Sequence, residues 1–341
     1  MKTIILALVV LAQTAASPNA PRWTLYNSGV TARLRGVSAP TANIVWASGS
    51  EGTIIRSTDG GRTWSRLTIP DADKLDFRDI DAIDERTAYV LSIGNGDASR
   101  IYKTTDAGAT WSLQFRNDDS KAFYDAMAFR DSRRGFAFSD SVDGRFVILR
   151  TDNGGRTWTK IPAAALPPAL PGEGAYAASG SNVALVGDNV WIGTSASRVV
   201  RSTDGGRSWA VVQTPIPSSS SAGIFSIAFR DPSRGVIVGG DYQKESEAVS
   251  NAAITADGGR TWAAVKGLTG FRSAVAYVPE LRDTWVAVGP SGCDLSRDDA
   301  RTWTAVTGQG FHAVSVPPHS TVAWTVGEKG SVAGLNIPRV P

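Results

Sequence analysis

The chain repeats one eight-residue phrase six times in its 341 residues. The phrase has the form Ser/Thr-x-Asp-Gly-Gly-Arg-Thr-Trp with small variations, and the copies end at Trp64, Trp111, Trp158, Trp209, Trp262 and Trp303. Successive copies are 41 to 53 residues apart. A period of this length is typical of the four-stranded blades of a β-propeller, so it constrains the fold before any single residue is interpreted.

The two ends of the chain complement each other. Trp23 lies 41 residues before Trp64 and begins a short run with the pattern of an outer strand. Residues 311–316 and 322–327 have the pattern of inner strands, but no copy of the phrase follows them. We therefore predict an all-β propeller of seven four-stranded antiparallel blades, in which residues 22–28 complete the last blade. This closure removes free sheet edges.

The phrase suits a tight turn between two strands. A Ser or Thr hydroxyl and an Asp carboxylate two residues later can accept hydrogen bonds from unpaired backbone N–H groups. Glycine tolerates a positive φ, and the tryptophan can pack between blades. A catalytic site uses a residue once, whereas this pattern recurs in every copy. We therefore interpret the repeated aspartates as structural.

Composition limits the class of protein. Residues 1–16 combine Lys2, an apolar run and small residues, which predicts a signal peptide and export to the periplasm or the medium. Residues 17–341 then form a single propeller. We expect no membrane insertion, and a formal net charge of +3 is too small to indicate nucleic-acid binding. Cys293 is the only cysteine, so no intrachain disulfide is expected, and no residue spacing indicates a metal or another cofactor.

The loops that lead into the first strand of each blade meet on one face of a propeller. Aligned on the apolar residues that follow, one position in five blades carries Arg35, Arg78, Tyr124, Arg272 and His312, and Glu173 lies close to it in a sixth. These residues differ between blades, as a single asymmetric site requires. Further candidates from the loops of this face are Asp125, Asp140, Tyr176, Asp241 and Tyr242. We predict that this set lines a central funnel.

Three arginines that converge on a funnel can bind a carboxylate or a sulfate in a bidentate manner. A second interpretation stays open, in which each arginine pairs with a neighbouring aspartate in a solvated channel. The aspartates close enough in sequence for this are Asp79, Asp81, Asp125 and Asp140. Perturbed and paired charges occur in both settings, so the sequence does not choose between them.

Over essentially the whole mature chain, the sequence resembles the Asp-box (BNR-repeat) propellers related to the photosystem II stability and assembly factor. The repeated phrases, the stretch from Val45 to Thr53 and the spacing of the blades carry this resemblance. It implies a non-enzymatic recognition scaffold that binds a protein segment at an arginine-lined face, which Arg35, Arg78 and Arg272 would form here. We accordingly expect a monomer whose partner is an anionic peptide or an acidic glycan.

The phrase is also similar to that of sialidases and of seven-bladed glycosidases and uronate lyases. This resemblance implies Tyr124 with Glu173 as the nucleophile pair and Asp79 as the acid/base. A glycoside hydrolase or lyase acting on acidic glycans is therefore the alternative function. Sialidases have six blades and an Arg-Ile-Pro phrase, which Leu34-Arg-Gly-Val37 does not match. A buried carboxylate in contact with Tyr124 favours an enzyme, and an exposed peptide-sized groove favours binding.

Overall fold

The computed structural model describes residues 20–339, and the predicted signal peptide lies outside this range. Within it, 28 strands form seven four-stranded antiparallel sheets. Six of the sheets pair their strands in chain order, and the seventh joins the first strand of the chain to the last three. The predicted seven-bladed, all-β propeller is confirmed.

The first four blades extend from Leu34 to Gln213. Blade one contains β2 (Leu34–Ser38), β3 (Val45–Gly49), β4 (Ile54–Ser57) and β5 (Ser65–Leu67). Blade two contains β6 (Asp76–Ala82), β7 (Ala88–Ile93), β8 (Arg100–Thr104) and β9 (Ser112–Arg116). Blade three contains β10 (Tyr124–Phe129), β11 (Gly135–Val142), β12 (Arg145–Thr151) and β13 (Thr159–Lys160). Blade four contains β14 (Val183–Val186), β15 (Asn189–Gly193), β16 (Arg198–Ser202) and β17 (Ala210–Gln213).

The other three blades follow the same plan. Blade five contains β18 (Ala222–Phe229), β19 (Gly235–Asp241), β20 (Ala252–Thr255) and β21 (Ala263–Val265). Blade six contains β22 (Ala274–Tyr277), β23 (Trp285–Gly289), β24 (Gly292–Ser296) and β25 (Thr304–Val306). Blade seven contains β26 (Ala313–Ser315), β27 (Val322–Val326), β28 (Val332–Asn336) and β1 (Arg22–Tyr26). Short 3₁₀ turns, η1 (Gly96–Ala98), η2 (Ala163–Ala165) and η3 (Glu328–Gly330), lie in the connections.

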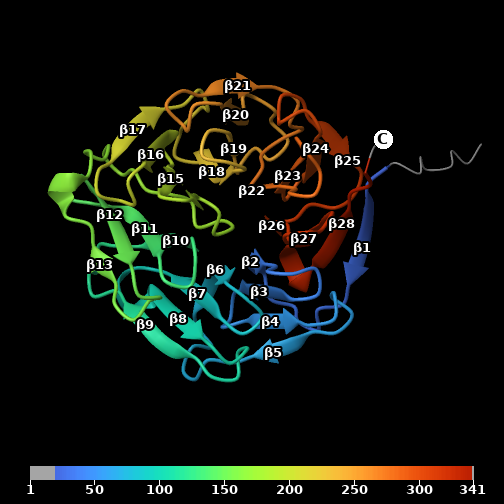
Figure 1. The fold of residues 1–341 in the computed structure, drawn as a ribbon, viewed down its shortest axis with the longest axis horizontal. Helices are drawn as coiled ribbons and strands as arrows, with labels where there is room; N and C mark the ends of the chain where they lie inside the picture. Colours follow the sequence, from blue (N-terminus) through green and yellow to red (C-terminus); the bar gives the residue numbers. More distant parts are fainter. Residues whose placement is uncertain (1–19, 340–341) are drawn as a thin grey trace, which may run out of the picture.

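The first strand of each blade lies around the middle of the ring (Figure 1). Each of these strands packs against the first strand of the next blade, and β26 packs against β2. Apolar side chains from adjacent sheets fill the seams between blades, as where Trp46 of blade one meets Phe77 and Ile80 of blade two. The residues that begin these inner strands are therefore brought together near the ring axis.

The ring closes between the two ends of the chain. β1 pairs with β28 from Arg22 and Asn336 through Tyr26 and Val332. The Trp23 ring lies 4.9 Å from that of Phe311, between blades six and seven. The predicted closure of the propeller by strands from both termini is confirmed.

Each copy of the repeated phrase forms the turn between the third and fourth strands of its blade. In blade one, the Gly61 N–H donates to the Ser57 hydroxyl at 2.8 Å, and the Thr63 N–H donates to the Asp59 carboxylate at 2.9 Å. Gly61 has a φ of +83°, and an added Cβ would lie 2.7 Å from the Trp324 ring of the preceding blade. The side chains of the phrase are thus used in the turn and the seam.

Candidate functional site

Four inner strands carry a β-bulge at the same place. The register shifts at Arg35 in β2, Arg78 in β6, Asp125 in β10 and Phe225 in β18. A bulge removes one residue from the regular alternation of the strand and redirects its side chain. These four residues therefore occupy equivalent positions at the end of the ring opposite the repeated turns.

Arg35 and Arg78 converge on one stretch of backbone. Arg35 Nη1 donates to the carbonyl oxygen of Ala178 at 3.3 Å, and Arg78 Nη1 donates to that of Ala177 at 3.0 Å. Both alanines belong to residues 174–182, which precede β14 and which we call the axial segment. Figure 1 shows this yellow-green part of the chain extending from blade four toward the middle of the ring. The structure thus brings two of the three predicted arginines together.

The arginine pair is a cationic site that is only partly neutralised. Arg78 Nε also pairs with the Asp76 carboxylate at 2.8 Å, and its side chain is 26% exposed. Burial, followed by repulsion from Arg78 and Arg33, lowers the pKa of Arg35 to about 10. The buried Arg35 Nε has no hydrogen-bond partner among the described residues. Because the cations repel each other, an added anion would stabilise both.

Arg272 does not join this pair. Its backbone N–H donates to the Gly239 carbonyl at 3.0 Å, as that of Leu34 does to Gly327. Arg272 therefore occupies the buried position of Leu34, one residue before the bulge position. Its guanidinium pairs with the Asp294 carboxylate at 2.6 Å, and both side chains are almost fully buried. The structure therefore places Arg272 in a buried ion pair, apart from Arg35 and Arg78.

His312 lies at the same end of the ring. Its Nε2 is 2.8 Å from Glu328 Oε1, which also accepts from Arg33 Nε at 2.5 Å. Burial and then Arg35 lower the pKa of His312 to about 4, so the ring is neutral at neutral pH. The buried Nδ1 has no partner among residues 20–339. His312 can therefore contribute a neutral polar group beside Arg35.

Asp125 and Asp140 form a buried carboxyl pair beside the axial segment. The Ala175 N–H donates to Asp140 Oδ1 at 3.2 Å. Burial, and for Asp125 also the neighbouring Asp140, raises the pKa of both carboxyl groups. Asp125 is the more buried of the two carboxyl groups, and its Oδ2 has no hydrogen-bond partner among the described residues. The pair supports the backbone of the axial segment.

Tyr124 is not at the bulge position, because Asp125 is. It is fully buried, its ring lies 5.1 Å from that of Phe115, and burial raises the pKa of its hydroxyl. The hydroxyl has no hydrogen-bond partner among the described residues, and no carboxylate is bonded to it. The sequence alignment on apolar residues therefore places blade three one residue out of register with blades one and two.

The other two residues considered for catalysis are held elsewhere. Glu173 is buried, forms an ion pair with Arg198 and accepts from the Thr194 hydroxyl at 2.7 Å. The buried Asp79 accepts from the Met127 N–H of the next blade at 2.6 Å. These contacts tie Glu173 and Asp79 to the framework, and Tyr124, Glu173 and Asp79 are all buried.

Tyr176 belongs to the axial segment, and its ring meets blade five, whereas Arg35 and Arg78 come from blades one and two. The Tyr176 ring stacks on Phe225 at 3.8 Å, and Tyr242 meets both rings edge-on at 6.2 Å. Tyr242 is 44% exposed, and Asp241 at the end of β19 accepts from the Gln243 N–H. The sequence analysis missed the backbone of Ala177 and Ala178. The unusually long Pro- and Gly-rich connection before β14 was the available signal.

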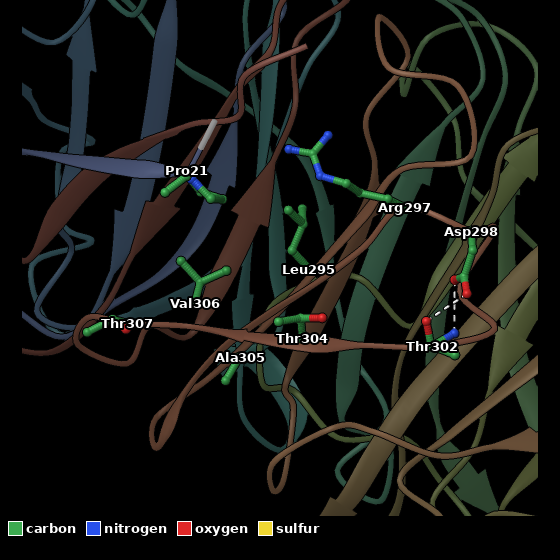
Figure 2. A pocket seen from close by; sticks show the side chains of 10 residues that line it. Pro21, Leu295, Arg297, Asp298, Thr302, Thr304, Ala305, Val306 and Thr307 are labelled. Carbon is green, nitrogen blue, oxygen red and sulfur yellow. Dashed lines mark hydrogen bonds between the residues drawn. The ribbon is translucent and has the colours of Figure 1, made fainter. Parts of the chain in front are cut away.

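A separate cavity of about 570 Å³ lies at the outer rim, between blades six and seven (Figure 2). It is lined by residues 20–21 and by parts of β24 and β25, including Leu295, Arg297 and Val306. At other seams the repeated turn of the following blade fills the equivalent place. Gly108 in the turn of blade two, for example, lies against Leu67 of blade one. Blade seven has no such turn, because the two ends of the chain meet there. The rim cavity is thus a consequence of closure.

Residues 20–339 contain no cluster of three or more His, Cys, Asp or Glu side chains placed to hold a metal ion. In the same residues, no helix is long and apolar enough to cross a bilayer.

Comparisons with known proteins agree with the repeat and the fold. The sequence model of the BNR/Asp-box repeat matches residues 55–66. The structure titled "YCF48 bound to D1 peptide" is 17% identical with a TM-score of 0.66, over 94% of this chain and 98% of that chain. YCF48 from Cyanidioschyzon merolae is also 17% identical with a TM-score of 0.66, over 92% and 98%. No curated protein sequence matches this chain. The predicted Asp-box repeat and propeller fold are confirmed, and the fold is similar to that of YCF48.

Proposed function

We propose that this protein is an exported, monomeric recognition scaffold that binds a carboxylate-bearing peptide at Arg35 and Arg78. The observation that carries the proposal is the convergence of the two guanidinium groups on consecutive backbone carbonyls, at 3.3 Å and 3.0 Å. The same donors suit the main chain of an extended peptide and, more strongly, a carboxylate. The structural neighbour described as bound to a peptide supports this choice of ligand.

Binding to a panel of short peptides, each with a free or an amidated C-terminus, tests the proposal. We expect the free carboxylate to bind better, and Arg35→Ala or Arg78→Ala to weaken binding about tenfold or more, because each removes a charge-assisted contact. The matched control is Arg207→Ala, which removes an exposed arginine from a repeated turn at the other end of the ring. Fluorescence anisotropy measures the affinities.

Two results would contradict the proposal. One is that both arginine variants bind every peptide as the parent does. The other is that an oligosaccharide of uronic acids binds tightly and is cleaved while no peptide binds, which would favour the acidic-glycan enzyme. Mass spectrometry of the incubated oligosaccharide detects cleavage.

A further inference from the structure

The arginine pair already holds part of this chain. In blade four, β14 begins only at Val183, and the nine preceding residues of the axial segment (174–182) lie across the ring axis. They contact blade one through Arg35, blade two through Arg78, and blades five and six through the contacts described next. The axial segment therefore occupies the place where an extended peptide would meet the arginines.

The axial segment is held firmly on one side. The Ser179 hydroxyl donates to the Ser273 carbonyl of blade six at 2.8 Å, and Ser181 Oγ bonds to Ser226 Oγ of blade five at 2.8 Å. The Tyr176 ring stacks on Phe225 with the planes 4° apart. The Ala178 side chain packs in the same cluster. These contacts fix the segment to blades five and six.

On the other side, Arg35 and Arg78 meet the axial segment only at neutral carbonyl oxygens, while Arg78 Nε pairs with the Asp76 carboxylate at 2.8 Å. A carboxylate brings a negative charge to the guanidinium and can accept two parallel hydrogen bonds from it, whereas a backbone carbonyl is neutral and offers one oxygen. A carboxylate that reaches Arg35 and Arg78 is therefore a better acceptor than the carbonyls of Ala177 and Ala178. The axial segment uses the Nη1 donors of Arg35 and Arg78, so a carboxylate that binds at both Nη1 atoms replaces the two carbonyls.

We propose that residues 174–182 act as an internal ligand that competes with the peptide for Arg35 and Arg78. This inference rests on the proposed function, because it concerns the same arginines. The incoming carboxylate replaces the two carbonyls, and the segment moves away from blades one and two. The peptide binds only to molecules in which the segment has left the arginines. The apparent affinity is therefore the intrinsic affinity multiplied by the fraction of such molecules. A variant with a loosened segment should consequently bind more tightly than the parent.

The first test concerns the segment alone and needs no peptide. Amide hydrogen exchange in residues 174–182 should be about tenfold faster in Arg35→Ala and in Arg78→Ala than in the parent, and unchanged in Arg207→Ala. Unchanged exchange in both arginine variants would show that the arginines do not hold the segment, and would overturn the inference.

The second test uses the pentapeptide Gly-Ala-Tyr-Ala-Ala, the sequence of residues 174–178, with a free C-terminal carboxylate. This carboxylate would take the place of the Ala178 carbonyl. Tyr176→Ala removes the stack on Phe225, and we expect it to raise the affinity about three- to tenfold. The control Tyr277→Ala removes an aromatic side chain from the far end of β22 and should leave the affinity unchanged.

The outcomes separate this inference from the proposed function. If Tyr176→Ala weakens peptide binding while the parent binds peptides through Arg35 and Arg78, the segment is a fixed wall of the site, and only the competition is overturned. If no variant binds any carboxylate peptide, the proposed function fails and the competition fails with it. Faster exchange in the segment on adding the pentapeptide to the parent supports both.

Discussion

At the scale of single residues, three residues at the end of the ring opposite the repeated turns differ in charge. Arg35 is a partly paired cation, His312 is neutral, and Asp125 shares a buried contact with Asp140. Burial is the first cause of the pKa shift at all three. The identity of a residue therefore does not by itself tell which residues at this end of the ring can attract an anion.

The pair of Asp125 and Asp140 predicts a pH effect on stability. A carboxyl whose pKa is higher in the folded than in the unfolded state makes the free energy of unfolding fall as the pH rises above about 4. We expect Asp125→Asn, which needs no proton to stay neutral, to be more stable than the parent by about 1–3 kcal/mol at pH 7 and by much less at pH 4. Urea denaturation at both values measures this.

A control with the opposite trend is available. Hydrogen bonds from Thr63 lower the pKa of Asp59 to about 2. The loss of stability that Asp59→Asn causes, relative to the parent, should therefore be larger at pH 7 than at pH 3. Asp79 and Asp81 also have raised pKa values, so the comparison is between variant and parent at each pH. Equal effects of Asp125→Asn at pH 4 and pH 7 would contradict the assignment.

At the scale of elements, the repeated turns hold the blades and the bulges expose the site. The two features lie at opposite ends of the strands, so mutation should separate them. In blade four, the buried Gly206 N–H donates to the Ser202 hydroxyl at 2.9 Å. That hydroxyl also donates to Asp204 at 2.8 Å.

Ser202→Ala should therefore destabilise the protein by about 1–3 kcal/mol, because it leaves a buried N–H without an acceptor. Peptide affinity should not change. The neighbouring Thr203 is exposed, and Thr203→Ala provides the matched control. Thermal unfolding and the anisotropy assay measure the two properties, and lost binding in a well-folded Ser202→Ala protein would show that the turns take part in function.

At the scale of the whole molecule, the seam between blades six and seven differs from the others. Among residues 20–339, no repeated turn joins β28 to β1, and the rim cavity lies beside β1 (Figure 2). Trp23 is the aromatic residue of β1 in this seam, where its Nε1 donates to the Thr307 carbonyl at 3.1 Å. Trp23 therefore contributes both packing and a hydrogen bond to this seam.

Trp23→Ala should lower the free energy of unfolding by an amount approaching the roughly 3–5 kcal/mol that loss of a core tryptophan costs. Exchange should become faster in β1 and β28 before it does in β4 and β5. Leu25→Ala is the control, because Leu25 is a 65% exposed residue of the same strand. Equal protection of the two strand pairs in the Trp23 variant would show that this seam is no weaker than the others.

The sequence alone determined the number of blades, the closure by both termini and the structural role of the repeated aspartates. It could do so because a turn that recurs every 41 to 53 residues is specified by local contacts within eight residues. The convergence of Arg35 and Arg78 was also predicted, since the repeat fixes which loops share a face.

Only the tertiary structure decided which predicted residues are available to a ligand. Tyr124 lies one residue before the bulge of its strand and Arg272 lies at the position of Leu34, and the apolar pattern does not reveal that both places are buried. The axial segment meets Arg35 and Arg78 from a position about 100 or more residues away along the chain. Contacts of this kind depend on how blades one, two and four are arranged around the axis, and no local sequence pattern encodes that arrangement.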